Sequence, residues 1–125
     1  MTPKILVSVG AVLAGIGVAA GAFGAHGLSD VLSPARMSVY ETAVRYHLIH
    51  AVALVVTGVL VTSVPAVQVA VSGYLFLTGI LLFSGSLYLL VLTDSPWLGA
   101  VTPFGGAAWI AGWAVLAYGA WKGLS

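Results

Sequence analysis

The sequence predicts an all-α, polytopic membrane protein: a bundle of four transmembrane helices with a short amphipathic interfacial segment after the first helix. Hydrophobic residues make up 61% of the 125 positions and charged residues only 6%, whereas soluble domains carry about 25% charged residues. The sequence contains four apolar stretches, three of which are close to the ~20 residues needed to cross a bilayer. Because four crossings use the whole length, residues 1–125 are expected to form a single domain.

The first crossing is expected over residues 5–25. A cleaved signal peptide is the alternative, because Lys4 precedes the apolar run and Ala20-Gly21-Ala22 resembles a cleavage site. Small residues spaced four and three apart fall in one stripe on a helix. Such a stripe lets helix backbones approach closely in lipid, where packing drives association. The stripe consists of Gly10, Ala14, Gly17, Gly21 and Gly24.

A second helix is predicted to begin at Ser33-Pro34, because serine is a favourable N-cap and proline a favourable first helical residue. The helical pattern continues to Ser63, just before Pro65. About 30 helical residues span ~45 Å, whereas the hydrocarbon core is ~30 Å thick. Residues 34–45 are therefore expected to lie at the membrane surface, and residues 46–63 to form the second crossing.

Residues 69–93 are the third predicted crossing and residues 103–122 the fourth. Each carries small residues at helical spacing, and Thr102-Pro103 repeats the cap-and-proline start. Trp109 and Trp113, one turn apart, are expected to pack against lipid or a neighbour, with a stacking surface as the alternative. The aromatic belts at the two membrane surfaces are predicted to contain Tyr74, Tyr88, Trp97 and Trp121.

Polar side chains are concentrated between Tyr40 and His50, in an otherwise apolar chain. If this segment is helical, the polar residues point to three different sides, so the segment must be wet or covered by other helices or chains. The three sides are formed by Glu41 with Arg45, by Tyr46 with His50, and by Tyr40 with His47.

Two interpretations of His50 stay open. Ala43, His50 and Thr57 are seven residues apart, which places His50 at the bundle axis if that seam faces inward. Ionisable groups inside a membrane are candidates for function, which favours a proton-accepting or ligand-binding site. The alternative is a neutral imidazole that is hydrogen-bonded between helices and fixes their register. Tyr46, Thr57 and His26 are its expected partners.

Other site types are weaker alternatives. His47 and His50 with His26 could hold a metal ion, and one or two histidines could hold haem, although no attachment motif is present. Glu41 and Arg45 are expected to form an i, i+4 ion pair. The alternative is a phosphate or lipid-headgroup site formed by Arg45 with Arg36. No cofactor and no metal are expected, and a chain without cysteine excludes thiol chemistry.

Four motifs in this order resemble one family, the domain of unknown function 423 family of small bacterial inner-membrane proteins, whose animal relatives include transmembrane protein 256. The resemblance covers essentially the whole chain and implies four crossings and a bacterial inner membrane, but no particular activity. His26, Tyr46 and His50 fall on positions that look like the family's motifs, whereas Glu41, Arg45 and His47 do not. The motifs are residues 21–28, 40–50, 82–88 and 102–106.

The sequence thus predicts a non-enzymatic membrane protein with a polar pocket for a small ligand, ion or lipid headgroup. A structural subunit of a larger membrane complex or homo-oligomer is the alternative, and the outer small-residue face at Gly15, Ala19 and Ala22 could serve it. The lipid bilayer is the expected partner, and a net charge of +1 argues against nucleic acid. Both termini are expected in the cytoplasm. The candidate site residues are His26, Tyr46, His50, Glu41, Arg45 and His47.

Overall fold

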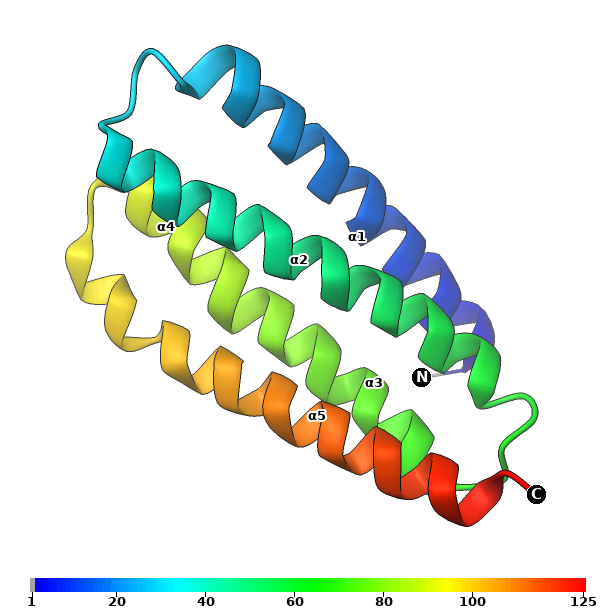
Figure 1. Cartoon of the computed structure of the whole chain (residues 1–125). Coiled ribbons are helices and arrows are strands. Elements are labelled where there is room, and N and C mark those ends of the chain that lie inside the picture. Colours follow the sequence, from blue (N-terminus) through cyan, green and yellow to red (C-terminus); the bar gives the residue numbers. More distant parts are fainter. Residues whose placement is uncertain (1) are drawn as a thin grey trace.

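The computed structural model describes residues 2–125 and shows a bundle of long helices (Figure 1). The first helix, α1 (Pro3–Phe23), continues into a π-helical turn, η1 (Gly24–Leu28). After a short connection the second helix, α2 (Pro34–Leu60), runs back along it.

The third long helix is built from α3 (Val67–Gly79), a π-helical turn η2 (Ile80–Ser84) and α4 (Gly85–Thr93). A short 3-10 helix, η3 (Pro96–Ala100), leads into α5 (Thr102–Gly123). Each of the four resulting segments has 26 to 28 residues and is apolar enough to cross a membrane. The predicted all-α fold with four membrane-spanning helices is therefore confirmed.

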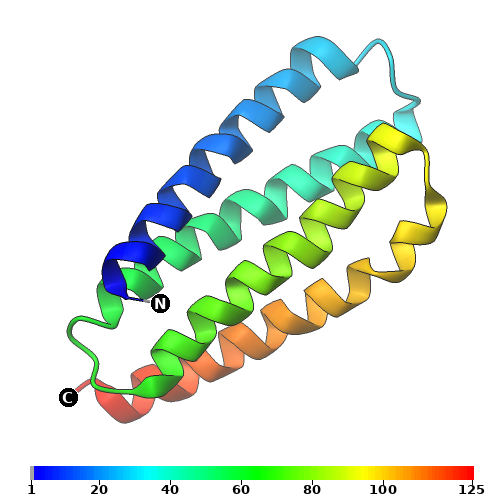
Figure 2. The same ribbon diagram turned by 180° about the vertical axis from the view of Figure 1, so that it is seen from behind.

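The helices pack in two pairs, α1 with α2 and the α3–α4 helix with α5. Contacts between α2 and the α3–α4 helix hold the two pairs together. The largest contacts are between α1 and α2 and between α3 and α5, and α2 also packs on α3, η2 and α4. As Figures 1 and 2 show, α1 and α5 lie at opposite edges of the bundle, and the two termini lie at the same end. Consequently, α2 has neighbours on several sides, and its polar residues enter different interfaces.

One of the two predicted helix caps is present. The Ser33 hydroxyl accepts a hydrogen bond from the backbone N–H of Arg36 (3.2 Å), with Pro34 as the first helical residue. The first helix begins earlier than expected, at Pro3, because Thr2 caps it in the same manner. The prediction for Thr102 is wrong, since it is already helical and its hydroxyl oxygen lies 2.6 Å from that of Ser86. This pair ties α5 to α4.

Residues 34–45 are not a separate helix. They form the first turns of α2, which continues without a break to Leu60 rather than Ser63. At 1.5 Å per residue, its 27 residues are ~40 Å long. The helix is thus still longer than a ~30 Å hydrocarbon core, and the position of its first turns at the membrane surface stays a prediction.

Small residues lie where the helices touch, as predicted. Gly10, Gly17 and Gly24 are buried against α2. A Cβ atom on Gly10 would lie 2.8 Å from the Val55 side chain and 3.0 Å from the Ala51 carbonyl oxygen, so the two backbones could not stay this close with any larger residue. The inward seam of α2 is also confirmed, because Ala43, His50 and Thr57 are all buried.

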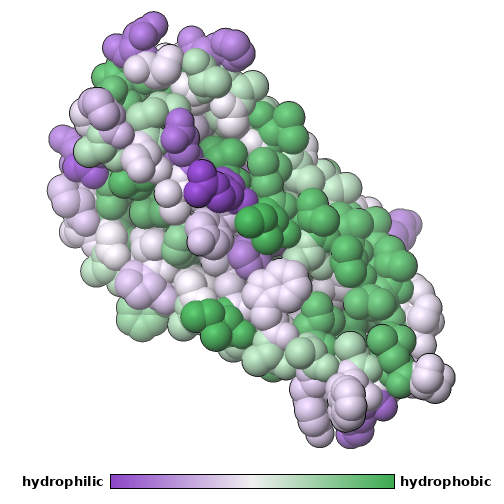
Figure 3. Space-filling model, in the orientation of Figure 1, coloured by the Kyte–Doolittle hydropathy of each residue, from purple (hydrophilic) through white to green (hydrophobic). Residues whose placement is uncertain are grey.

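The ends of the bundle carry most of the charge. Asp94 ends α4 in the left-handed conformation (φ 51°) and accepts a hydrogen bond from the Arg36 guanidinium at 2.9 Å. In Figure 3 hydrophilic atoms gather at both ends and in a patch that extends from the α1–α2 connection toward the middle of the visible face. Two further charged residues, Glu41 and Arg45, are exposed on the first half of α2.

Candidate functional site

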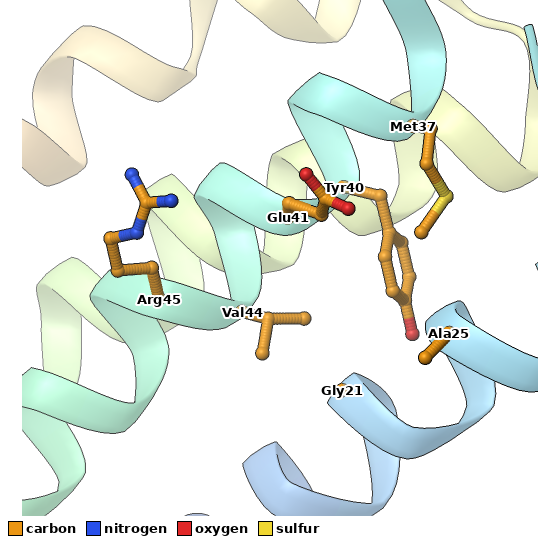
Figure 4. Close-up of a pocket in the computed structure, with 7 residues that line it drawn as sticks. All are labelled: Gly21, Ala25, Met37, Tyr40, Glu41, Val44 and Arg45. Atoms are coloured by element: carbon orange, nitrogen blue, oxygen red, sulfur yellow. The ribbon is translucent and has the colours of Figure 1, made fainter. Parts of the chain in front are cut away.

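The structure distributes the candidate residues over separate places instead of one pocket. Tyr46 and His50 face α5, and His47 is buried toward α1 and α4. Glu41 and Arg45 line a groove against α1 (Figure 4). The sorting of α2 into three polar sides is therefore confirmed. The expectation that these residues share one pocket is wrong, because Tyr46 and His50 line a groove with α5, Glu41 and Arg45 line one with α1, and His47 lines neither.

His50 is buried, and both of its ring nitrogens have partners. Its Nδ1 lies 2.7 Å from the Tyr46 carbonyl oxygen, which can only accept, so Nδ1 carries the proton. The indole Nε1–H of Trp113 donates to its Nε2 at 3.0 Å. Since an indole N–H can only donate, Nε2 must keep its lone pair, and the imidazole is the neutral Nδ1–H tautomer.

Trp109 supports the other side of the imidazole. Its ring stacks on that of His50 with a centroid distance of 3.8 Å and an interplanar angle of 5°. The Trp109 indole N–H donates to the Phe76 carbonyl oxygen at 3.1 Å, which anchors the ring to α3. Trp109 is buried against neighbouring helices, which confirms the expected packing against a neighbour, and it also stacks on the His50 ring.

A groove of about 620 Å³ runs along the side of the bundle between α2 and α5. Tyr46 and Trp113, 40% and 44% exposed, form much of its accessible aromatic surface. Within residues 2–125 the Tyr46 hydroxyl makes no hydrogen bond, so it is available to a ligand. The lining residues are Thr42, Tyr46, Ile49, His50, Phe83, Gly106, Trp109, Ile110 and Trp113.

His47 links three helices and lines no groove. Its Nε2–H donates to the Leu13 carbonyl oxygen (2.7 Å) on α1, and its Nδ1 accepts from the Tyr88 hydroxyl (2.8 Å) on α4. Tyr40 packs beside Tyr88 at 5.6 Å and donates to the Ala20 carbonyl oxygen at 2.6 Å. The prediction of Tyr88 as a belt residue is therefore wrong, because its hydroxyl points into the bundle.

Glu41 and Arg45 do not form the predicted ion pair. Among residues 2–125 the only ion pair within 4.0 Å joins Arg36 to Asp94. Exposed i, i+4 pairs gain only about 0.3–0.5 kcal/mol, too little to fix two long side chains. In Figure 4 their charged ends stand apart, with the Arg45 guanidinium pointing away from Gly21 and Ala25, while Tyr40 points across the groove of about 170 Å³ toward α1.

His26 lies apart from the other histidines. It is exposed in the π-helical turn at the end of α1, whereas His47 and His50 are buried in the middle of α2. In the described part of the chain no three His, Asp or Glu side chains come together as metal ligands. The three-histidine site considered from the sequence is therefore not formed, because both buried imidazoles are occupied by other partners.

Comparison with known proteins gives one family and several close relatives. The family described as "Protein of unknown function (DUF423)" matches residues 20–106. A UPF0382 membrane protein of Staphylococcus haemolyticus is 43% identical over 119 residues, which cover 95% of this chain and 97% of the relative. The UPF0382 membrane protein YwdK of Bacillus subtilis is 41% identical over 120 residues, with 95% and 98% covered. No solved structure matches the chain.

Proposed function

This multi-pass membrane protein belongs to the DUF423 family of proteins of unknown function, and we propose that it is a non-enzymatic binding protein. Its ligand is a small, mostly apolar molecule dissolved in the bilayer, and its site is the groove between α2 and α5. The ligand carries a flat unsaturated part that stacks on the aromatic wall and one polar group that reaches Tyr46.

The groove is the observation that supports this proposal. Its volume of about 620 Å³ lies within the roughly 300–1,000 Å³ typical of small-molecule sites. It runs beside the middle of α2 and α5, so in a bilayer it opens toward the acyl chains. Ile49 and Ile110 form exposed apolar edges. Because the Tyr46 hydroxyl is the free polar group at this wall, it would fix the orientation of the ligand.

The arrangement of His50 favours binding over catalysis. A general base needs a lone pair within reach of the substrate proton, but the only lone pair of this imidazole accepts the Trp113 N–H. The imidazole holds Trp113 at the groove through its Nε2, and it stacks on Trp109, whose ring in turn lies 5.9 Å from the Tyr46 ring. We therefore assign His50 the role of positioning the aromatic wall, without a cofactor or a metal.

The proposed location is the bacterial plasma (inner) membrane, with both termini in the cytoplasm. Lys4 and Lys122 lie near the two termini, which share one end of the bundle (Figure 1). At the other end Arg36 is paired with Asp94. Of the cations without an ion pair in residues 2–125, Lys4 and Lys122 lie at the terminal end and Arg45 lies toward the other, and an excess of Lys and Arg is typical of a cytoplasmic side.

Mass spectrometry of molecules that co-purify with the protein in mild detergent tests this function. Ile110→Trp should fill the groove and remove the ligand, and Tyr46→Phe should weaken its retention by removing one hydrogen bond. Tyr118→Phe is the matched control, because Tyr118 is an exposed tyrosine on α5 outside the groove. The proposal fails if the wild-type protein and Ile110→Trp retain the same molecules in the same amounts.

The second candidate is a structural subunit of a homo-oligomer or of a larger membrane complex. It is favoured by an outer face of α1 where Gly15, Ala19 and Ala22 are all exposed, with no atom within 4 Å of a Cβ built on Gly15. Small residues on an open face suit close helix contact in lipid. Gly15→Leu should then dissociate the assembly in blue-native electrophoresis, while ligand retention at the α2–α5 groove stays unchanged.

A further inference from the structure

The second groove of the molecule carries two charges that the chain itself does not neutralise. Glu41 and Arg45 are exposed on α2, one helical turn apart, and neither forms an ion pair within residues 2–125. An unpaired charge is costly in contact with hydrocarbon. Because the other residues that line this groove are mostly apolar, a partner from outside the chain is needed to neutralise the two side chains.

The depth of these charges points to the headgroup region. Arg36, paired with Asp94, marks the polar end of the bundle. Measured along α2 at 1.5 Å per residue, Glu41 lies ~8 Å and Arg45 ~14 Å below Arg36. Long side chains reach back toward the surface, so their charged groups lie at successive depths, with the carboxylate nearer the surface than the guanidinium.

The groove beneath these charges is lined by small and apolar residues. It has a volume of about 170 Å³ between α1 and α2. Gly21 and Ala25 leave room on the α1 side, and Val44 and the Tyr40 ring form the α2 side (Figure 4). The Tyr40 hydroxyl is already engaged with the Ala20 carbonyl oxygen. The apolar part of the groove can therefore accept part of an acyl chain, whereas Glu41 and Arg45 require a charged partner.

We propose that the Glu41–Arg45 groove binds a zwitterionic phospholipid with a primary ammonium headgroup, that is, a phosphatidylethanolamine. Arg45 binds the phosphate, Glu41 accepts hydrogen bonds from the ammonium, and one acyl chain lies along Gly21 and Ala25. The order of charges matches, because in this lipid the phosphate is attached to the glycerol and the ammonium lies farther out. A guanidinium binds phosphate through two parallel hydrogen bonds.

The carboxylate sets the selectivity. Phosphatidylglycerol would meet Arg45 with the same phosphate, but it has no ammonium to neutralise Glu41, so the repulsion between its phosphate and the carboxylate would stay uncompensated. A phosphatidylcholine has a quaternary nitrogen without N–H groups, so it cannot donate to Glu41. This site is independent of the proposed α2–α5 groove, which lies on another side of α2.

Native mass spectrometry in detergent with equimolar phosphatidylethanolamine and phosphatidylglycerol of identical acyl chains tests the proposal. The wild-type protein should retain the ethanolamine lipid preferentially. Glu41→Gln should reverse the preference toward the glycerol lipid, because it removes the negative charge that attracts the ammonium and repels the phosphate. Arg45→Gln should lower the binding of both lipids roughly tenfold, the loss expected for one charge-assisted contact.

Matched controls remove one negative and one positive charge outside the groove. Asp30→Asn and Lys122→Gln alter exposed residues outside the groove and should leave the lipid preference unchanged, as should Ile110→Trp in the other groove. The proposal is overturned if Glu41→Gln and Asp30→Asn select lipids alike, or if phosphatidylcholine binds as well as phosphatidylethanolamine. It is also overturned if the Glu41 and Arg45 variants convert a dimer to monomers without changing lipid selection, because the charges would then meet a second copy of the chain.

Discussion

Replacing Gly79 by alanine should displace Trp109, the residue whose ring stacks on His50. A Cβ atom on Gly79 would overlap the indole ring of Trp109, at Cδ1 and Nε1. This ring cannot yield by rotating a flexible end, because it is stacked on His50 at 3.8 Å and its N–H donates to the Phe76 carbonyl oxygen. The added methyl group must therefore push Trp109 away from α3.

The expected loss follows from three contributions. Overpacking a core costs about 1–3 kcal/mol, and the displaced indole loses a hydrogen bond worth about 0.5–1.5 kcal/mol. Alanine returns about 0.5–1 kcal/mol through its better helix propensity. Gly79→Ala should thus destabilise the protein by roughly 1–3 kcal/mol, and the fluorescence of the buried Trp109 should shift to longer wavelength as its ring is displaced.

Gly85→Ala is the control, since it lies six residues later in the same long helix and its Cβ would meet only the Ile80 carbonyl oxygen at an ordinary 3.7 Å. Unfolding in a detergent or denaturant titration, followed by tryptophan fluorescence, gives both free energies of unfolding. The reasoning is refuted if Gly79→Ala and Gly85→Ala have the same stability to within about 0.5 kcal/mol, the usual range for a substitution that touches nothing.

Three further predictions follow from the same geometry. Gly10→Ala should destabilise the α1–α2 pair by about 1–3 kcal/mol, because its Cβ would meet the α2 backbone. Gly15→Ala should be neutral or slightly stabilising, because its Cβ would meet no atom within 4 Å. Thermal unfolding of the two variants compares them directly. Asp94→Gly should be tolerated and Asp94→Ala should cost about 1 kcal/mol in the same assay, because the residue is left-handed at φ 51° and its exposed ion pair contributes little. Nitrogen-15 NMR of the imidazoles should show neutral rings protonated at Nε2 in His47 and at Nδ1 in His50, and the same tautomer in both would contradict the hydrogen-bond assignment.

The fold could be predicted from the sequence because its signals are local and periodic. Gly10, Gly17 and Gly24 repeat at seven-residue spacing, and all three are buried where α1 meets α2. The same periodicity separated the polar sides of α2 correctly, because those directions depend only on the helix itself.

The partners of those polar sides could not be predicted, because they depend on how distant helices are rotated. Trp113 is 63 residues from His50, and the sequence offered no sign that it donates to the imidazole. The π-helical turn η2 precedes Tyr88 and changes the direction of the residues after it relative to a regular helix. Tyr88 was therefore assigned to the surface, although its hydroxyl reaches His47.

The central position of α2 explains why one polar segment can serve several purposes. A helix with a single neighbour would have to expose most of the polar residues between 40 and 50 to lipid. Here His47 is satisfied by α1 and α4, and His50 by its own helix and α5. Glu41 and Arg45, on the remaining side, are the charged residues of this segment, and they lack an ion-pair partner within residues 2–125. Substitutions at His47 should therefore change stability without changing either groove's ligand, whereas those at Tyr46 should affect the α2–α5 groove and those at Glu41 lipid selection, each without affecting the other groove.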